Sequence, residues 1–230
     1  MICIFGGTAA YHLTAVDFGV AEPLFALETP HGVAAPFLRL RDVLFTSRHG
    51  VNELARSAAF VNHRANLWAA RAHGASAVLS WNGVGAISAR LRVGDQVVPH
   101  DLLDFTRGRA LPRQALPEMR APFWDVGRQA LLSAALRARE QGVYACGEGP
   151  RLETPAEINA FEKMGADVVG MTLVPEVFLA AEFGLPYAAL CIVTNLAAGR
   201  STPESGRRFG VEVGREGLTA CRRAAALMQS

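Results

Sequence analysis

The stretch "GEGPRLETPAEINAFEKMGADVVGMTLVPEVFLAAEFGLPYAALCIVTNLAAG", from Gly147 to Gly199, decides the fold of this chain. Two apolar runs within it, Val168–Gly170 and Tyr187–Thr194, are continuous rather than alternating, which is typical of strands covered on both faces. Two helical segments share the stretch, and each begins near a Pro and ends at a Gly. This order of buried strands and helices predicts an α/β fold.

The first of these helices has a clear start signal. Thr154 is placed to act as N-cap, Pro155 stands at the first helical position, and Glu157 follows three residues after the cap. We therefore expect a helix that begins directly after Glu153 and ends at Gly165. The second helix is expected over "VPEVFLAAEFG".

The same alternation of strands and helices extends over all 230 residues. Further strands are expected at Ile2–Phe5, Val43–Ser47, Ala77–Trp81, Gln96–Pro99 and Val143–Cys146. Further helices are expected at about Ala59–Ala72, Trp124–Gln141 and Gly210–Met228. Because no repeat, linker or low-complexity segment divides the chain, we expect a single α/β domain over residues 1–230. The loop Phe105–Phe123, with three prolines and four arginines, is the least regular part.

Composition restricts the partners of the protein. Half of the residues are hydrophobic and 19% are charged, against a usual charged share of about 25%. An apolar single domain of this kind is expected to have part of its surface covered by further copies of the chain. The net charge of +2 gives no basic field, so nucleic acid and anionic membrane are not expected as partners.

The cysteines and the amino end point to a cytoplasmic protein without a metal. The four cysteines show no CxxC spacing and are expected to be reduced; they are Cys3, Cys146, Cys191 and Cys221. Met1 leads directly into a strand, which leaves no room for a signal peptide. No apolar run approaches the roughly 20 residues that span a bilayer.

Polar or glycine-containing motifs follow six of the expected strands. Ligands of open α/β sheets bind at the carboxyl ends of strands, so these motifs are candidates for a binding site. They are "GGT" (Gly6–Thr8), "RHG" (Arg48–Gly50), "NGVG" (Asn82–Gly85), "LET" (Leu152–Thr154), "MT" (Met171–Thr172) and "TN" (Thr194–Asn195).

Three of these motifs suit an oxyanion. Backbone N–H groups beside the Thr8 hydroxyl form an anion cradle, and the Arg48 guanidinium can donate two bonds to a phosphate. His49 adds a third donor, and Gly83 lets the backbone approach an anion closely. Each motif alone is more often a turn or a solvated strand end, but their occurrence at successive strand ends favours an anion site.

The other three motifs suit a planar heterocycle and a sugar. Glu153 can accept N–H donors, Asn195 has both a donor and an acceptor, and Met171 offers an adaptable apolar surface. Taken singly, each has an alternative structural interpretation: a helix start for Glu153, a turn cap for Asn195 and a core position for Met171.

These residues carry a family resemblance. The motif set GP-x-x-ETPAE…MT-x-VPEV…TNLAAG closely resembles the signature region of the trimeric purine nucleoside phosphorylases and methylthioadenosine phosphorylases. The segments "IFGGT", "SRHG", "VNHRANLWAARAHGASAVLS" and "LRVGD" are similar, in the same order, to the methylthio-nucleoside branch. The resemblance covers nearly the whole chain. It implies a mixed, partly barrel-like sheet flanked by helices and a homotrimer, in which the loop Phe105–Phe123 is the candidate for reaching a neighbour.

The reaction that the resemblance implies is phosphorolysis, in which phosphate attacks C1′ of a purine nucleoside and releases the free base. His49 and Asn195 are the implied catalytic residues, and no metal or organic cofactor is required. The implied phosphate contacts are Thr8, Arg48, His49, the backbone of Asn82 and Gly83, and Thr172. Met171 would carry the sugar, and the implied base contacts are Leu152, Glu153, Asn195, Leu196 and Ala197.

The base contacts favour a 6-oxopurine. The Glu153 carboxylate needs the N1–H of such a base, and the Asn195 amide can donate to O6 while it accepts from a protonated N7. Where relatives that bind a 5′-hydroxyl have a His, this chain reads "GVEV" (Gly210–Val213). An apolar wall there favours 5′-methylthioinosine, unless Arg207 or Arg208 supplies a donor.

Other functions stay open at this point. A general inosine and guanosine phosphorylase and a methylthioadenosine phosphorylase are the enzymatic alternatives. A nucleoside-binding protein without catalysis is the alternative from another class.

Overall fold

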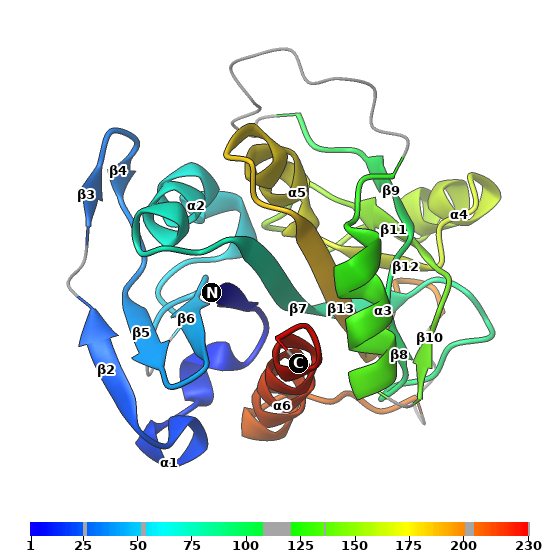
Figure 1. Ribbon diagram of the computed structural model, residues 1–230. Helices are drawn as coiled ribbons and strands as arrows, with labels where there is room; N and C mark the ends of the chain where they lie inside the picture. The colour runs from blue at the N-terminus through cyan, green and yellow to red at the C-terminus, as the bar shows by residue number, and fades with distance from the viewer. Residues whose placement is uncertain (25–26, 52–53, 108–120, 136, 201–204, 230) are drawn as a thin grey trace.

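The computed structural model describes residues 1–24, 27–51, 54–107, 121–135, 137–200 and 205–229 (Figure 1). In these ranges the strands form an 11-stranded sheet and a separate two-stranded sheet of β3 (Glu28–Thr29) and β4 (Gly32–Val33). The large sheet contains β1 (Ile2–Gly6), β2 (Ala21–Leu24), β5 (Phe37–Leu40), β6 (Val43–Ser47), β7 (Ala77–Ala86), β8 (Gln96–Val97), β9 (Asp101–Asp104), β10 (Ala138–Arg139), β11 (Val143–Cys146), β12 (Val168–Gly170) and β13 (Tyr187–Leu196).

The helices flank this sheet. They are α1 (Ala15–Phe18), α2 (His63–Ala72), α3 (Asp125–Ala134), α4 (Pro155–Lys163), α5 (Leu173–Glu182) and α6 (Val211–Leu227), with 3-10 turns η1 (Ala10–His12) and η2 (Ala58–Phe60). Figure 1 shows α6 and α3 side by side across one face of the central strands, and the two helices are in contact. α2 and α5 also pack against each other.

The long strand β7 joins two sets of strands. Its first part lies between β1 and β13 and runs parallel to both. Its last residues, Gly85 and Ala86, pair antiparallel with β12, which continues to β11 and β9. The mixed sheet with flanking helices that the sequence and its resemblance implied is therefore confirmed.

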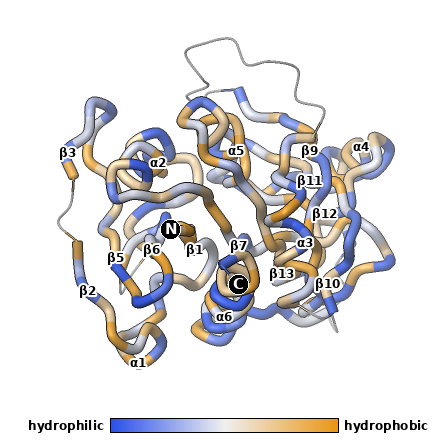
Figure 2. Tube along the Cα trace, in the orientation of Figure 1, coloured by the Kyte–Doolittle hydropathy of each residue, from blue (hydrophilic) through white to orange (hydrophobic). Residues whose placement is uncertain are grey.

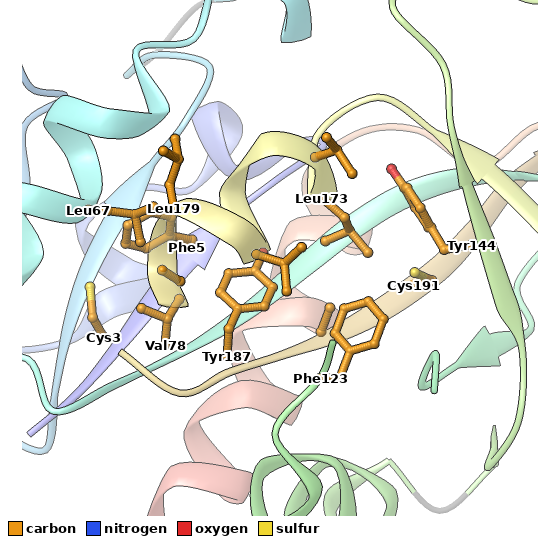
Figure 3. Close-up of a cluster of buried hydrophobic side chains, with 14 of the residues drawn as sticks. Cys3, Phe5, Leu67, Val78, Phe123, Tyr144, Leu173, Leu179, Tyr187 and Cys191 are labelled. Carbon is orange, nitrogen blue, oxygen red and sulfur yellow. The ribbon is translucent and has the colours of Figure 1, made fainter. Parts of the chain in front are cut away.

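Both faces of the central strands are buried, as their continuous apolar runs predict. On β1, Cys3 and Phe5 belong to one hydrophobic cluster, whereas Ile2 and Ile4 belong to another. The first cluster includes α2 and α5 side chains, and Figure 3 shows Leu67 and Leu179 of these helices with Tyr187 of β13. The second cluster includes buried residues of α3 and α6, and hydrophobic and hydrophilic residues alternate along α6 (Figure 2).

Several expected boundaries are wrong. β7 and β13 are longer than predicted, so Asn82–Gly85 and Asn195 lie inside strands rather than after them. The helix expected over Trp124–Gln141 ends at Ala134, because the following residues pair as β10 with β8. The helix expected from Ala59 begins only at His63, after η2 and the N-cap Asn62.

Tertiary pairing also creates strands that the sequence pattern did not reveal. β2 and β5 extend the sheet beyond β6, and β9 pairs with β11. Most of the loop Phe105–Phe123, residues 108–120, lies outside the described residues, so its expected contact with a neighbour stays a prediction. In the described part of the chain, no helix is long and apolar enough to cross a membrane.

Candidate active site

A cavity of about 290 Å³ lies where the carboxyl-terminal parts of β1, β6, β7, β12 and β13 meet. It collects nearly all of the site residues expected from the sequence. The expected site residues that line the cavity are Thr8, His49, Asn82, Gly83, Leu152, Glu153, Met171, Thr172, Asn195, Leu196 and Ala197. The polar motifs near the strand ends therefore meet at one cavity, and their ligand contacts stay a prediction.

Part of the cavity lining is a set of small polar groups. Thr172 Oγ1 donates to Asn82 Oδ1 (2.7 Å), and the Gly83 N–H donates to Thr8 Oγ1 (3.2 Å). The Thr8 hydroxyl accepts this bond on its oxygen and has one hydrogen of its own, which it can donate to an anion. These four residues come from three segments of the chain and form a compact polar floor.

His49 borders this floor and is almost fully buried. Its Nδ1 lies 3.0 Å from the carbonyl oxygen of Arg56, whose N–H donates back to the His49 carbonyl. Burial and, next, the charge of Arg48 lower the pKa of His49 to about 4. The ring is therefore neutral at pH 7, with its orientation fixed by the loop that follows it.

Arg48 lies behind the cavity wall, and its guanidinium is held by Glu176 of α5. Nε donates to Glu176 Oε1 (2.8 Å) and Nη2 to Glu176 Oε2 (2.7 Å), while Nη1 donates to the Trp81 carbonyl (3.1 Å). Both side chains are fully buried. Glu176 therefore occupies the Nε and Nη2 side of the guanidinium, and the expected two bonds from Arg48 to a phosphate stay a prediction.

Glu176 is the functional residue that sequence reasoning missed. Its carboxylate also accepts from Tyr187 Oη and lies 3.1 Å from His63 Nδ1, and Tyr187 Oη bonds Ser80 Oγ (2.8 Å). Burial alone would raise the pKa of Glu176, but Arg48 and His63 outweigh it and hold that pKa at about 2. The Pro-Glu pair of "VPEV" was visible in the sequence, yet only folding shows that it faces Arg48.

Glu153 also lines the cavity and stands one residue before the N-cap of α4. Thr154 and Glu157 form the expected capping box, with bonds of 3.2 Å and 2.7 Å. Because Glu157 satisfies the helix start, the Glu153 carboxylate is not needed there. Partial burial raises the pKa of Glu153, which makes its carboxylate a stronger acceptor.

Asn195 enters the cavity at a bulge in β13. The register with β7 shifts between Val193 and Asn195, which re-aims the side chain relative to the regular strand. The amide accepts from Thr194 Oγ1 (3.0 Å) and donates to the Leu196 carbonyl (2.9 Å). A Cβ on Gly85 would meet Asn195 Nδ2 at 3.3 Å, so Gly85 leaves room for the amide.

Met171 lines the same cavity and directly follows β12. Gly149 packs against its sulfur, where a Cβ would come within 2.7 Å, and Gly149 also has a φ of +68° that favours Gly. Leu152 lines the cavity but is 67% exposed, so it forms part of the rim.

Four further lining residues were not expected from the sequence: Ala58, Val169, Gly170 and Ala198. Val84 and Gly85 of "NGVG" line the cavity as well, and so does Arg207, the candidate donor at the 5′ end of the sugar. The neighbouring residue Arg208 holds this segment in place. The Arg208 N–H donates to the Thr194 carbonyl (2.7 Å), and the Arg208 side chain pairs with Glu216 (2.9 Å). The four cysteines are free and buried, and no metal-binding group of three or more His, Cys, Asp or Glu side chains occurs in the described ranges.

Comparison with known proteins agrees with this geometry. The family model of the Phosphorylase superfamily matches residues 5–229. A probable S-methyl-5′-thioinosine phosphorylase of Methanothermobacter thermautotrophicus is 40% identical over 86% of this chain and 72% of its own length. A probable 6-oxopurine nucleoside phosphorylase of Moorella thermoacetica is 38% identical over 89% and 83%, respectively.

A solved structure shows the same fold. Methylthioadenosine phosphorylase from Schistosoma mansoni superposes with a TM-score of 0.84 at 27% identity, over 99% of this chain and 91% of that protein. The chain therefore belongs to the phosphorylase superfamily, and its resemblance to the nucleoside phosphorylases is confirmed.

Replacing Glu176 by Gln is expected to destabilise the protein by about 3–5 kcal/mol, because it leaves the Arg48 guanidinium buried without its counter-charge. Urea unfolding measures this change. The matched control is Glu162→Gln, whose half-exposed carboxylate pairs with Arg200 at 2.6 Å and which we expect to cost about 0–1 kcal/mol. If Glu176→Gln lowers the free energy of unfolding by less than about 1 kcal/mol, the range of an exposed pair, the buried pair of Arg48 and Glu176 does not stabilise the fold as stated.

Proposed function

We propose that this enzyme catalyses phosphorolysis of a 6-oxopurine nucleoside, with 5′-methylthioinosine as the favoured substrate. The observation that supports it best is a single cavity lined both by the polar floor and by Glu153 and Asn195. Met171, which lines the same cavity, offers an apolar surface for the sugar.

The reaction needs no covalent enzyme intermediate, metal or organic cofactor. An oxygen of phosphate forms a bond to C1′ while the bond from C1′ to N9 breaks and its electron pair moves onto the purine. The sugar passes through a cationic state, which the phosphate anion on the polar floor stabilises. Groups placed where charge develops are usually the largest single catalytic contribution.

Glu153 and Asn195 stabilise the leaving base. Asn195 has one amide hydrogen beyond its bond to Leu196, which can donate to O6, and its Oδ1 can accept from N7 after N7 takes a proton from water. The Glu153 carboxylate accepts from N1–H. Adenine has no N1–H and presents a donor at C6, so both residues favour a 6-oxopurine.

Phosphate dependence of base release tests the proposal directly. Inosine, 5′-methylthioinosine and methylthioadenosine are compared with and without inorganic phosphate. The expected result is base release from the two 6-oxopurine nucleosides that requires phosphate. Release without phosphate would indicate a hydrolase, and binding without turnover would indicate a nucleoside-binding protein.

Replacing Asn195 by Asp is expected to reduce turnover of 6-oxopurine nucleosides by about tenfold to a hundredfold. A carboxylate oxygen would face O6, where a donor is needed, and such a mismatch costs about 1–3 kcal/mol. The ratio of kcat/KM for inosine to that for adenosine measures the effect. An unchanged ratio would remove Asn195 from the base pocket.

The 5′ end of the sugar separates two candidate functions. The start of α6 at Val211, with Gly210 before it, supplies no side-chain donor, which favours a methylthio group. Arg207, however, lines the cavity and could donate to a 5′-hydroxyl, and this observation favours a general inosine phosphorylase as the second candidate.

We expect 5′-methylthioinosine to exceed inosine by about tenfold or more in kcat/KM, because an unpaired buried hydroxyl costs about 1–3 kcal/mol. Arg207→Ala should leave this ratio unchanged, like the control Arg223→Ala on the exposed face of α6. A preference for inosine that Arg207→Ala abolishes would establish the second candidate instead.

We also propose that the protein is a homotrimer in the cytoplasm. Support comes from the apolar composition and from two exposed aromatic side chains near the cavity mouth, Phe60 (70% exposed) and Phe209 (58%). They lie two residues from the lining residues Ala58 and Arg207, where a second chain would cover them.

Light scattering at micromolar concentration is expected to give a mass near three times 24.6 kDa. Replacing Phe60 by Ser should weaken the assembly. The control is Val20→Ser, at the exposed residue directly before β2, which should leave the assembly unchanged. A monomeric wild-type protein would contradict the proposed assembly.

A further inference from the structure

The sequence predicted that His49 donates a hydrogen bond to the anion, but the contact between His49 and Arg56 indicates the opposite direction. The carbonyl oxygen of Arg56 can only accept, so the proton of the neutral ring resides on Nδ1. This leaves Nε2, which has a lone pair in that tautomer, as the ring nitrogen available to a ligand in the cavity that His49 lines.

We propose that His49 accepts a hydrogen bond from a protonated oxygen of the bound anion, so that the site selects phosphate, which carries a P–O–H group, over sulfate, which carries none. This inference rests on the proposed phosphorolysis and assigns the direction of one of its contacts. It also makes His49 a residue that determines the specificity for the anion.

The surroundings keep the ring neutral. The charge of Arg48 and the nearby His63 oppose protonation, and burial opposes it most strongly. The Arg56 carbonyl and the Glu176 carboxylate act in the other direction, but Glu176 is already neutralised by its pair with Arg48. The pKa of about 4 leaves the imidazole uncharged over the whole neutral range.

The polar groups next to His49 include one hydrogen-bond donor and further acceptors. The Thr8 hydroxyl hydrogen can donate to an anion, whereas the Thr172 hydroxyl gives its hydrogen to Asn82 and turns only lone pairs to the cavity. An anion without a proton would set its lone pairs against those of His49 and Thr172. An anion with a proton can satisfy one of these acceptors while its other oxygens accept.

Nitrogen NMR of the histidine side chains tests the tautomer directly. Between pH 6 and 8, with and without inorganic phosphate, His49 is expected to show a neutral ring protonated at Nδ1. Its signal is the one missing from the spectrum of His49→Gln or, if that variant does not fold, the one that shifts most on phosphate titration. A doubly protonated ring, or a ring protonated at Nε2, would overturn the inference.

Calorimetric titration with phosphate and with sulfate tests the selectivity. The wild-type protein is expected to bind phosphate about tenfold to a hundredfold more tightly, the range for one mismatched buried hydrogen bond. His49→Gln should narrow this ratio, because its amide can donate to either anion, whereas His12→Gln at an exposed position should not. Equal affinities in the wild type, or an unchanged ratio in His49→Gln, would overturn the inference.

Failure of the inference is distinguishable from failure of the proposed function. If His49 is cationic while base release still requires phosphate, phosphorolysis stands and only the polarity is wrong. If phosphate neither binds nor supports base release, the proposed function fails as well.

Discussion

The buried ion pair between Arg48 and Glu176 organises the site. Transfer of two charges out of water costs several kcal/mol per ion, and such a pair is tolerated only when its geometry and remaining hydrogen bonds are nearly complete. Arg48 and Glu176 meet this condition with three guanidinium–carboxylate contacts between 2.7 and 3.1 Å. Further contacts to Tyr187 and His63 tie β13 and α2 to the same carboxylate.

This pair fixes the segments that carry the cavity residues. His49 follows Arg48 directly at the end of β6, and Thr172 stands at the N-terminal end of α5, four residues before Glu176. Tyr187 connects the pair to Ser80, and Ser80 accepts from Asn82 Nδ2 (3.3 Å). The polar floor is thus the exposed side of a buried hydrogen-bonded network, which makes its geometry rigid rather than adaptable.

The same pair shapes the electrostatics of the proposed phosphate site. Because Glu176 neutralises Arg48, the proposed discrimination between anions depends on the hydrogen-bond donors and acceptors of the floor. Their directions are set by second partners: Arg56 for His49, Asn82 for Thr172 and Gly83 for Thr8. The capping box of α4 leaves Glu153 unused by the helix, and the bulge in β13 directs Asn195 into the cavity.

The sequence by itself determined the order of the buried strands and helices, because continuous apolar runs mark strands with two covered faces. Polar motifs near the ends of these strands, together with the family resemblance, named most of the residues that line the cavity. The tertiary structure alone decided the ends of β7 and β13, the pairing of β10, and the partner of Arg48. Glu176 is 128 residues away along the chain, and no local pattern encodes a contact that forms only when α5 packs against the end of β6. The hydrogen-bond direction at His49 was hidden for the same reason, since it depends on where the backbone of Arg56 returns.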